Sequence, residues 1–190
     1  MTSGDLARIG PNAVIQTLRA LDEVPGRAEV VRRRAGLEPG APDGMIPEAW
    51  FVRLLTAVRQ TLPADEAESV LADSGRRTAR YVANHRIPRL FRALLRHLPP
   101  RIGVSLMLRA FTRHAWTFAG GGQFEAEGLT IVLRDAPTCR GQEADHALGA
   151  YYAAAFEGLL SVAAPGVEVH ETHCQAQGAD GCHFHITLES

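Results

Sequence analysis

The chain has 190 residues, the length of one domain or of one domain with a helical extension. Its 46% hydrophobic content allows a sizeable core, and three cysteines are too few for a disulfide framework, so we expect reduced thiols in a cytoplasmic protein. The sequence opens without a basic segment and apolar run, so no signal peptide is predicted. The longest apolar stretch, residues 147–164, contains Glu157 and predicts a buried helix rather than a membrane span.

Charge is unevenly distributed along the chain, although the net charge is only −1. All 20 basic residues are arginines, and residues 74–124 contain ten of them and no Asp or Glu. Those ten are Arg76, Arg77, Arg80, Arg86, Arg89, Arg92, Arg96, Arg101, Arg109 and Arg113. Residues 125–190 contain ten acids and two arginines. Local fields steer ligands even when the net charge is small, so the arginine-rich segment is a candidate surface for anions.

Helical spacing dominates the first 115 residues. Apolar positions and prolines predict helices over residues 11–24 and 26–35, from Pro47 to about residue 62, after Pro63, over residues 88–98, and up to about residue 114. In the helix after Pro63, acids occupy the first turn and arginines lie toward the far end, an arrangement that suits the helix dipole.

The pattern changes after residue 116. Alternating residues 129–134 predict a half-buried strand, and residues 142–162 predict a helix. Residues 167–176 and 182–188 predict two strands joined by a turn at 178–181, with Cys182 and Phe184 on one face and His183 and His185 on the other. Helices followed by a mainly antiparallel sheet predict an α+β fold whose ligand site lies between sheet and helices.

The most specific candidate site combines Cys139, Glu171, Cys174 and Cys182. The predicted hairpin brings residues 174 and 182 together, and Cys139 follows the preceding strand. Three thiolates and a carboxylate fit a closed, tetrahedral, structural Zn²⁺ site. The alternative is that the cysteines are small buried apolar residues. His146, His173, His183 and His185 are rival fourth ligands, and the last two rank lower because they alternate to the face opposite Cys182.

A second candidate site is the arginine-rich block. Arg89, Arg92 and Arg96 share one helical face and could meet carboxylates, phosphates or an anionic membrane surface, although a solvated surface face is an equally good explanation. Histidines of the same region could ligate the metal of a tetrapyrrole, and aromatic residues could line a flat apolar pocket or simply form the core. These candidates are His85, His97, His114, Trp116, Tyr151 and Tyr152.

Several functions lack their motifs in this sequence. There is no dinucleotide or P-loop glycine motif, no nucleophile elbow, and too few cysteines for a four-cysteine [4Fe–4S] cluster. No aromatic platform alternates with the arginines, so nucleic acid is not an expected partner.

The C-terminal motifs resemble the 4-vinyl reductase domain family. They are Cys139-Arg-Gly, Tyr151-Tyr152, Phe156-Glu-Gly and the run Glu171-x2-Cys174-x7-Cys182-x-Phe184. The resemblance covers about residues 80–188 and implies a small-ligand-binding fold related to nitric-oxide-sensing haem domains and vesicle-tethering subunits. It divides the chain into a helical extension, residues 1–79, and a ligand-binding domain, residues 80–190.

The resemblance also implies ligands and a function. Sensor members of the family hold zinc with three cysteines and one acid, which correspond to Cys139, Glu171, Cys174 and Cys182 here, although the segment between the first two is longer in this chain. The whole chain is similar to the bacteriochlorophyll-biosynthesis members. This similarity implies binding of a Mg-porphyrin or protochlorophyllide and its delivery to a tetrapyrrole-pathway enzyme. The alternatives are reduction of the 4-vinyl group with an external reductant and a ligand sensor. Peripheral membrane contact and a homodimer are further interactions to be considered.

Overall fold

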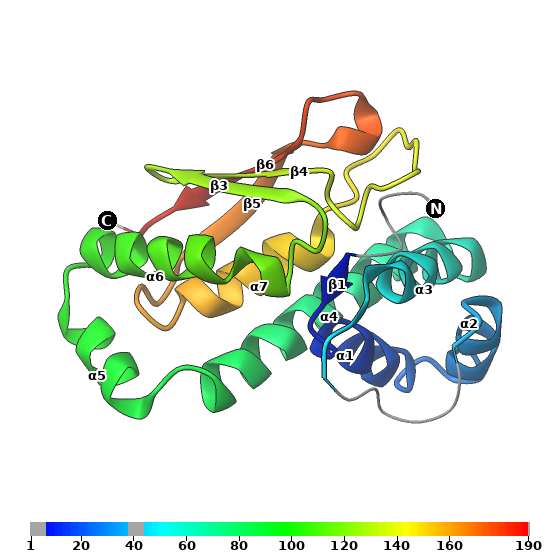
Figure 1. Ribbon diagram of the computed structural model, residues 1–190, viewed down its shortest axis with the longest axis horizontal. Helices are drawn as coiled ribbons and strands as arrows, with labels where there is room; N and C mark the ends of the chain where they lie inside the picture. Colours follow the sequence, from blue (N-terminus) through cyan, green and yellow to red (C-terminus); the bar gives the residue numbers. More distant parts are fainter. Residues whose placement is uncertain (1–6, 38–43, 190) are drawn as a thin grey trace.

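The computed structural model describes residues 7–37 and 44–189. It is an α+β fold in which helices pack on one face of a four-stranded antiparallel sheet, as the sequence predicts (Figure 1). In that part of the chain, no helix is long and apolar enough to cross a bilayer.

Prolines mark where four of the helices begin. Helices α3 (Glu48–Thr61), α4 (Ala64–His85), α5 (Arg89–His97) and α6 (Pro100–His114) each follow a proline whose ψ is extended. Proline lacks an N–H and disfavours a helical residue before it, so the chain turns sharply at each of these points. Helices α1 (Asn12–Leu21) and α2 (Ala28–Arg34) precede them, and β1 (Arg8–Ile9) pairs with β2 (Ile46–Pro47).

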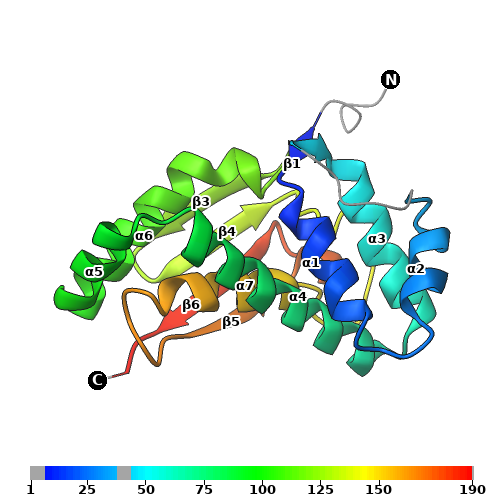
Figure 2. The ribbon, with the colours of Figure 1, turned by 90° about the horizontal axis from the view of Figure 1, so that it is seen from below.

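The sheet has the order β3-β4-β6-β5. Its strands are β3 (Gln123–Glu127), β4 (Thr130–Arg134), β5 (Glu168–His173) and β6 (Cys182–Thr187). Helices α6 and α7 (Ala150–Leu160) lie against one face, and the other face has no helical layer in the described chain (Figures 1 and 2). Phe156 of α7 stands at the centre of the core and makes ring contacts with Phe124 and Phe184 of the sheet.

A close crossing of α4 and α7 joins the N-terminal helices to the rest of the fold. Gly75 of α4 lies directly against the backbone of Tyr151, where any side chain would collide. The predicted division between residues 79 and 80 falls inside α4, and it stays a prediction.

Three local expectations differ from the structure. The helix predicted over residues 142–162 begins only at Ala150, because the backbone N–H groups of Ala144, Leu148 and Gly149 bond to distant residues instead. The strand predicted over residues 167–176 ends at His173 and is followed by the short 3₁₀ helix η3 (Gln175–Gln177). Strand β3 was not predicted.

Candidate metal centre and ligand-binding surface

The three cysteines form one buried cluster. Cys139 lies in the loop after β4, Cys174 follows β5, and Cys182 is the first residue of β6. The Sγ atom of Cys139 lies 3.6 Å from that of Cys174 and 3.3 Å from that of Cys182, and all three lie within 4.8 Å of one another. Three thiolates on a tetrahedral Zn²⁺ with Zn–S distances of about 2.3 Å would stand about 3.8 Å apart. The cluster could therefore hold a metal after a small adjustment.

Hydrogen bonds at the cluster favour a thiolate at Cys174. The backbone N–H of Leu148 donates to Cys174 Sγ at 3.3 Å. Hydrogen bonds from the thiols of Cys139 and Cys182 lower the pKa of Cys174, and the bond that Cys139 makes to Cys174 raises the pKa of Cys139 to about 11. Metal ligation requires deprotonated thiols, so a bound cation would replace these shared protons.

Glu171 reaches the cluster from β5. Its Oε2 accepts a hydrogen bond of 2.6 Å from the backbone N–H of Gly149, at the N-terminus of α7, and a side chain on residue 149 would collide with this carboxyl group. Oε1 of Glu171 is buried and has no hydrogen-bond partner in the described chain. Burial, followed by the charge of Cys174, raises the pKa of Glu171 to about 8. Glu171 is not a member of the 4.8 Å sulfur group, but its orphaned oxygen next to thiol sulfurs fits a cation.

Two arginines that were not among the predicted site residues hold the loop that carries Cys139. Arg59 of α3 donates to the carbonyl oxygens of Thr138 at 2.8 Å and of Leu148 at 2.9 Å, and it forms a salt bridge of 2.7 Å with Glu68. Arg140 forms a salt bridge with Glu48, whose side chain is 1% exposed. Only the position of Arg140 next to Cys139 could have suggested this role.

The rival histidines lie away from the sulfurs or on the surface. His146, His173 and His185 are exposed. His183 is half-buried, and its Nε2 lies 3.0 Å from an oxygen of Asp180. Residues of β6 alternate as predicted, with Cys182 and Phe184 buried and His185 exposed.

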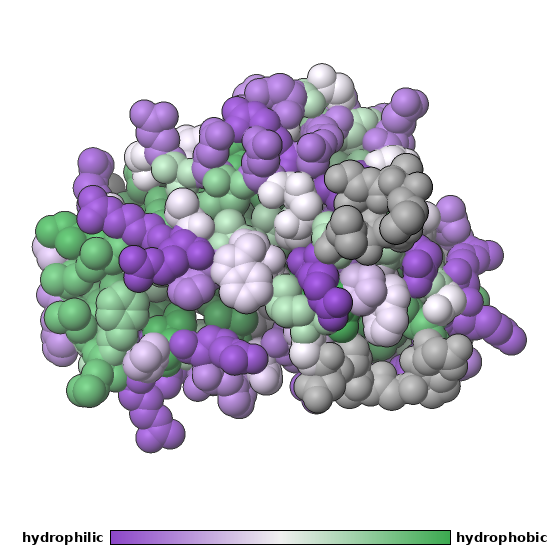
Figure 3. Space-filling view, in the orientation of Figure 1, coloured by the Kyte–Doolittle hydropathy of each residue, from purple (hydrophilic) through white to green (hydrophobic). Residues whose placement is uncertain are grey.

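The arginine-rich block lies mostly on the surface of α5 and its neighbours. Arg89 and Arg96 are exposed, and Arg92 donates to Asn84 at 3.1 Å. Between them, Leu90 is 87% exposed and Leu94 is 53% exposed. Figure 3 shows this apolar surface at the end of the molecule where α5 projects. The structure therefore combines apolar side chains and cations on one helix.

The other predicted ligand residues are dispersed. His97 lies on α5, His85 stacks on Tyr81 near the end of α4, and His114 ends α6. Trp116 is 60% exposed, beyond the end of α6. Tyr151 and Tyr152 are instead buried in the core. Their hydroxyl groups donate to Thr78 Oγ1 and to the Phe118 carbonyl oxygen, respectively.

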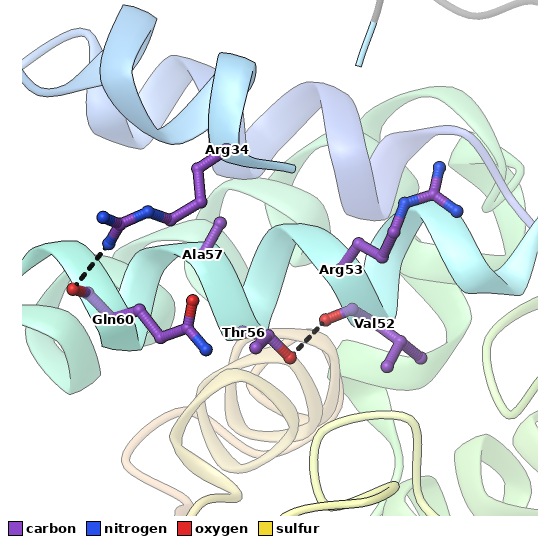
Figure 4. A pocket seen from close by; sticks show the side chains of 6 residues that line it. All are labelled: Arg34, Val52, Arg53, Thr56, Ala57 and Gln60. Atoms are coloured by element: carbon purple, nitrogen blue, oxygen red, sulfur yellow. Dashed lines mark hydrogen bonds between the residues drawn. The ribbon is translucent and has the colours of Figure 1, made fainter. Parts of the chain in front are cut away.

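Two surface hollows lie elsewhere. One of about 160 Å³ lies between α2 and α3, where Arg34 donates to the Gln60 carbonyl oxygen (Figure 4). An open hollow of about 770 Å³ beside η3 includes Glu143 and Asp145 in its lining, and no arginine. Neither contains a residue of the predicted ligand set, and the acids of the larger hollow would repel an anionic ligand.

Comparison with known proteins identifies the family. The model of the 4-vinyl reductase domain matches residues 129–188, a span that contains all four predicted zinc ligands. A bacteriochlorophyll synthase 23 kDa chain of Cereibacter sphaeroides is 37% identical over 186 residues, which are 94% of this chain and 90% of that protein. One of Rhodobacter capsulatus is 40% identical over 190 residues, with coverage of 95% and 87%. This chain belongs to the family of the bacteriochlorophyll synthase 23 kDa chain.

The identification from sequence motifs is thus confirmed. A solved structure supports the fold of this 23 kDa-chain family member. The crystal structure of an H-NOX protein from S. oneidensis in the Fe(II)NO ligation state has a TM-score of 0.50, with coverage of 96% of this chain and 100% of that one. Since the identity is 15%, this likeness shows the fold alone.

Proposed function

We propose that this protein binds a Mg-tetrapyrrole intermediate of bacteriochlorophyll biosynthesis, a Mg-porphyrin or protochlorophyllide, and delivers it to a pathway enzyme. Its membership of the 23 kDa-chain family carries the proposal and supports a role in that biosynthesis. The sequence contains no dinucleotide-binding motif, which favours a carrier over a reductase that uses its own nicotinamide cofactor.

The surface of α5 offers what such a ligand needs. A tetrapyrrole is a flat apolar ring with anionic carboxylates at its edge, and α5 exposes Leu90 and Leu94 beside Arg89 and Arg96. His97 lies three residues after Leu94 on the same helix, so it is the best-placed of the three candidate axial donors. Self-association and the identity of the recipient enzyme stay predictions.

We also propose that Cys139, Glu171, Cys174 and Cys182 hold a structural Zn²⁺. The support is the sulfur cluster, the N–H donor to Cys174 and the orphaned oxygen of Glu171. The ion would tie the loop after β4 to the β5–β6 hairpin, and four protein ligands would leave it no open position for catalysis.

A titration with protochlorophyllide tests the carrier function. The expected result is a shifted absorption band that saturates near one equivalent, with no vinyl-to-ethyl conversion when NADPH is added. Replacing Arg89, Arg92 and Arg96 with Gln should weaken binding, whereas Arg33→Gln on α2, at the opposite end of the molecule, should not (Figures 1 and 2). Single replacements of His85, His97 and His114 identify any axial donor.

Two results would contradict the carrier function. Pigment that fails to co-elute with the protein in gel filtration would remove the binding step. Multiple-turnover formation of the ethyl product by the isolated protein would establish the reductase alternative.

A further inference from the structure

Helix α5 is amphipathic, and only part of its apolar face is covered by the protein. Leu95 is its one buried residue, while Phe91 and the following Leu98 are partly buried against the core. Leu90 and Leu94, one helical turn apart, face solvent with 87% and 53% of their surface exposed. The helix is therefore attached to the body along one edge and presents the other edge outward.

Exposed apolar residues are concentrated at this end of the molecule. Ile102, in the first turn of α6, is 51% exposed and extends the patch. In the described chain, three of the five large apolar side chains that are exposed belong to α5 and the start of α6. Figure 3 shows the continuous apolar surface there, with hydrophilic side chains around it. Scattered exposed residues need no explanation, but a local group on one amphipathic helix does.

Cations without carboxylate partners surround this patch. Arg86, Arg89, Arg96 and Arg101 are exposed, and none of them forms a salt bridge with any residue that the structure describes. The sequence from residue 74 to residue 124 offers no acid that could neutralise them. An occupant of this surface must supply both hydrocarbon and negative charge.

We propose that α5 and the first turn of α6 dock on a membrane surface that contains anionic lipid. Leu90, Leu94 and Ile102 enter the boundary of the acyl chains, and Arg89 and Arg101 contact headgroup phosphates. A helix with leucines on one face and arginines on the other is the usual form of such an anchor. Three protruding side chains offer little area for a stable protein interface, which buries about 800 Å² per partner, whereas lipid needs no complementary shape.

This inference goes beyond the proposed carrier function and does not require it. If both hold, the same helix would meet the pigment at the lipid surface where an apolar molecule is collected or released. The test therefore uses vesicles without pigment, so that a failed pigment titration and a failed membrane contact remain separate results.

The experiment is flotation of the full-length protein with two kinds of vesicle. One is phosphatidylcholine alone, and the other contains about one quarter phosphatidylglycerol, which supplies the anionic surface. We expect binding to the anionic vesicles only, and its loss when the salt concentration is raised from about 50 mM to about 500 mM. Leu90→Gln with Leu94→Gln should reduce the bound fraction at least about tenfold, because less apolar surface enters the lipid.

A matched control lies at the opposite end of the molecule. Val30 and Arg33 of α2 are also exposed, so Val30→Gln with Arg33→Gln changes exposed side chains of the same kinds without touching α5 and should leave binding unchanged. Circular dichroism checks that each variant is folded. Equal binding of the wild type and the α5 variant, or no binding to anionic vesicles, would overturn the proposal. Self-association that the α5 variant abolishes, without any vesicle binding, would assign the surface to a second copy instead.

Discussion

The cysteine cluster and α5 differ in how far the protein itself satisfies their side chains. At the cluster, loops and strands from distant parts of the sequence bring three buried sulfurs within 4.8 Å, and the surrounding backbone supplies hydrogen bonds. On α5, leucines and arginines from consecutive turns face solvent, and the exposed arginines have no salt bridge in the described chain. A buried convergent cluster is built for stability, whereas an exposed amphipathic helix depends on an external partner.

The largest expected effect is loss of the cluster. Cys182→Ser should reduce the free energy of unfolding by at least about 4 kcal/mol, which corresponds to a fall in Tm of roughly 8–16 °C, because the metal then no longer favours the folded state. Thermal unfolding measures the fall, and elemental analysis of the wild type should find about one Zn per chain. A chelator should destabilise the wild type and leave the variant unchanged. Wild-type protein with less than about a tenth of an equivalent of Zn, and insensitive to chelation, would refute the metal site.

Removing the clamp on the Cys139 loop should have the next largest effect. Arg59→Gln should cost about 2–4 kcal/mol, because it breaks a largely buried ion pair with Glu68 and leaves two carbonyl oxygens without their donor. Urea unfolding measures the difference. Arg53→Gln on the same helix is the control, because Arg53 is exposed and its guanidinium donates to the Ala35 carbonyl oxygen, away from the Cys139 loop. Equal losses from both variants would exclude a special role for Arg59.

Replacing the predicted carboxylate ligand should have a smaller effect on the fold. Glu171→Gln can still accept the hydrogen bond from Gly149 but loses its negative charge, so zinc affinity should fall about 10- to 100-fold. Competition with a chromophoric chelator measures this affinity. An unchanged affinity would make Glu171 a cap of α7 only and leave the fourth ligand to another group.

The smallest expected effect on stability is on α5. Leu94→Ala should change the free energy of unfolding by no more than about 0.5 kcal/mol, because the side chain is already 53% exposed. Its neighbour Leu95 is fully buried, so Leu95→Ala should cost about 2–4 kcal/mol in the same assay. A large loss from Leu94→Ala would mean that α5 is more tightly packed in solution than the structure shows, and would weaken the contrast between the two regions.

Most helices could be predicted from sequence because their signals are local. Prolines before α3, α4, α5 and α6 and the spacing of apolar residues gave their positions to within a few residues. The segment from Gln142 to Gly149 failed this reasoning, because its N–H groups bond to Cys174, Glu171 and Ala176 rather than to its own carbonyl groups. Such bonds depend on the position of the β5–β6 hairpin, which helix periodicity cannot report.

The sequence by itself determined the α+β class, the family and the residues of the cysteine cluster, because helix starts, strand alternation and the Glu171–Cys182 motif are short-range patterns. Only the tertiary structure decided that Arg59 and Glu48 hold the Cys139 loop and that Tyr151 and Tyr152 belong to the core. It also decided that Leu95 is buried while Leu94 is exposed, although both belong to the apolar face of one helix. Periodicity defines the apolar face of a helix, but the neighbouring elements decide how much of that face is covered.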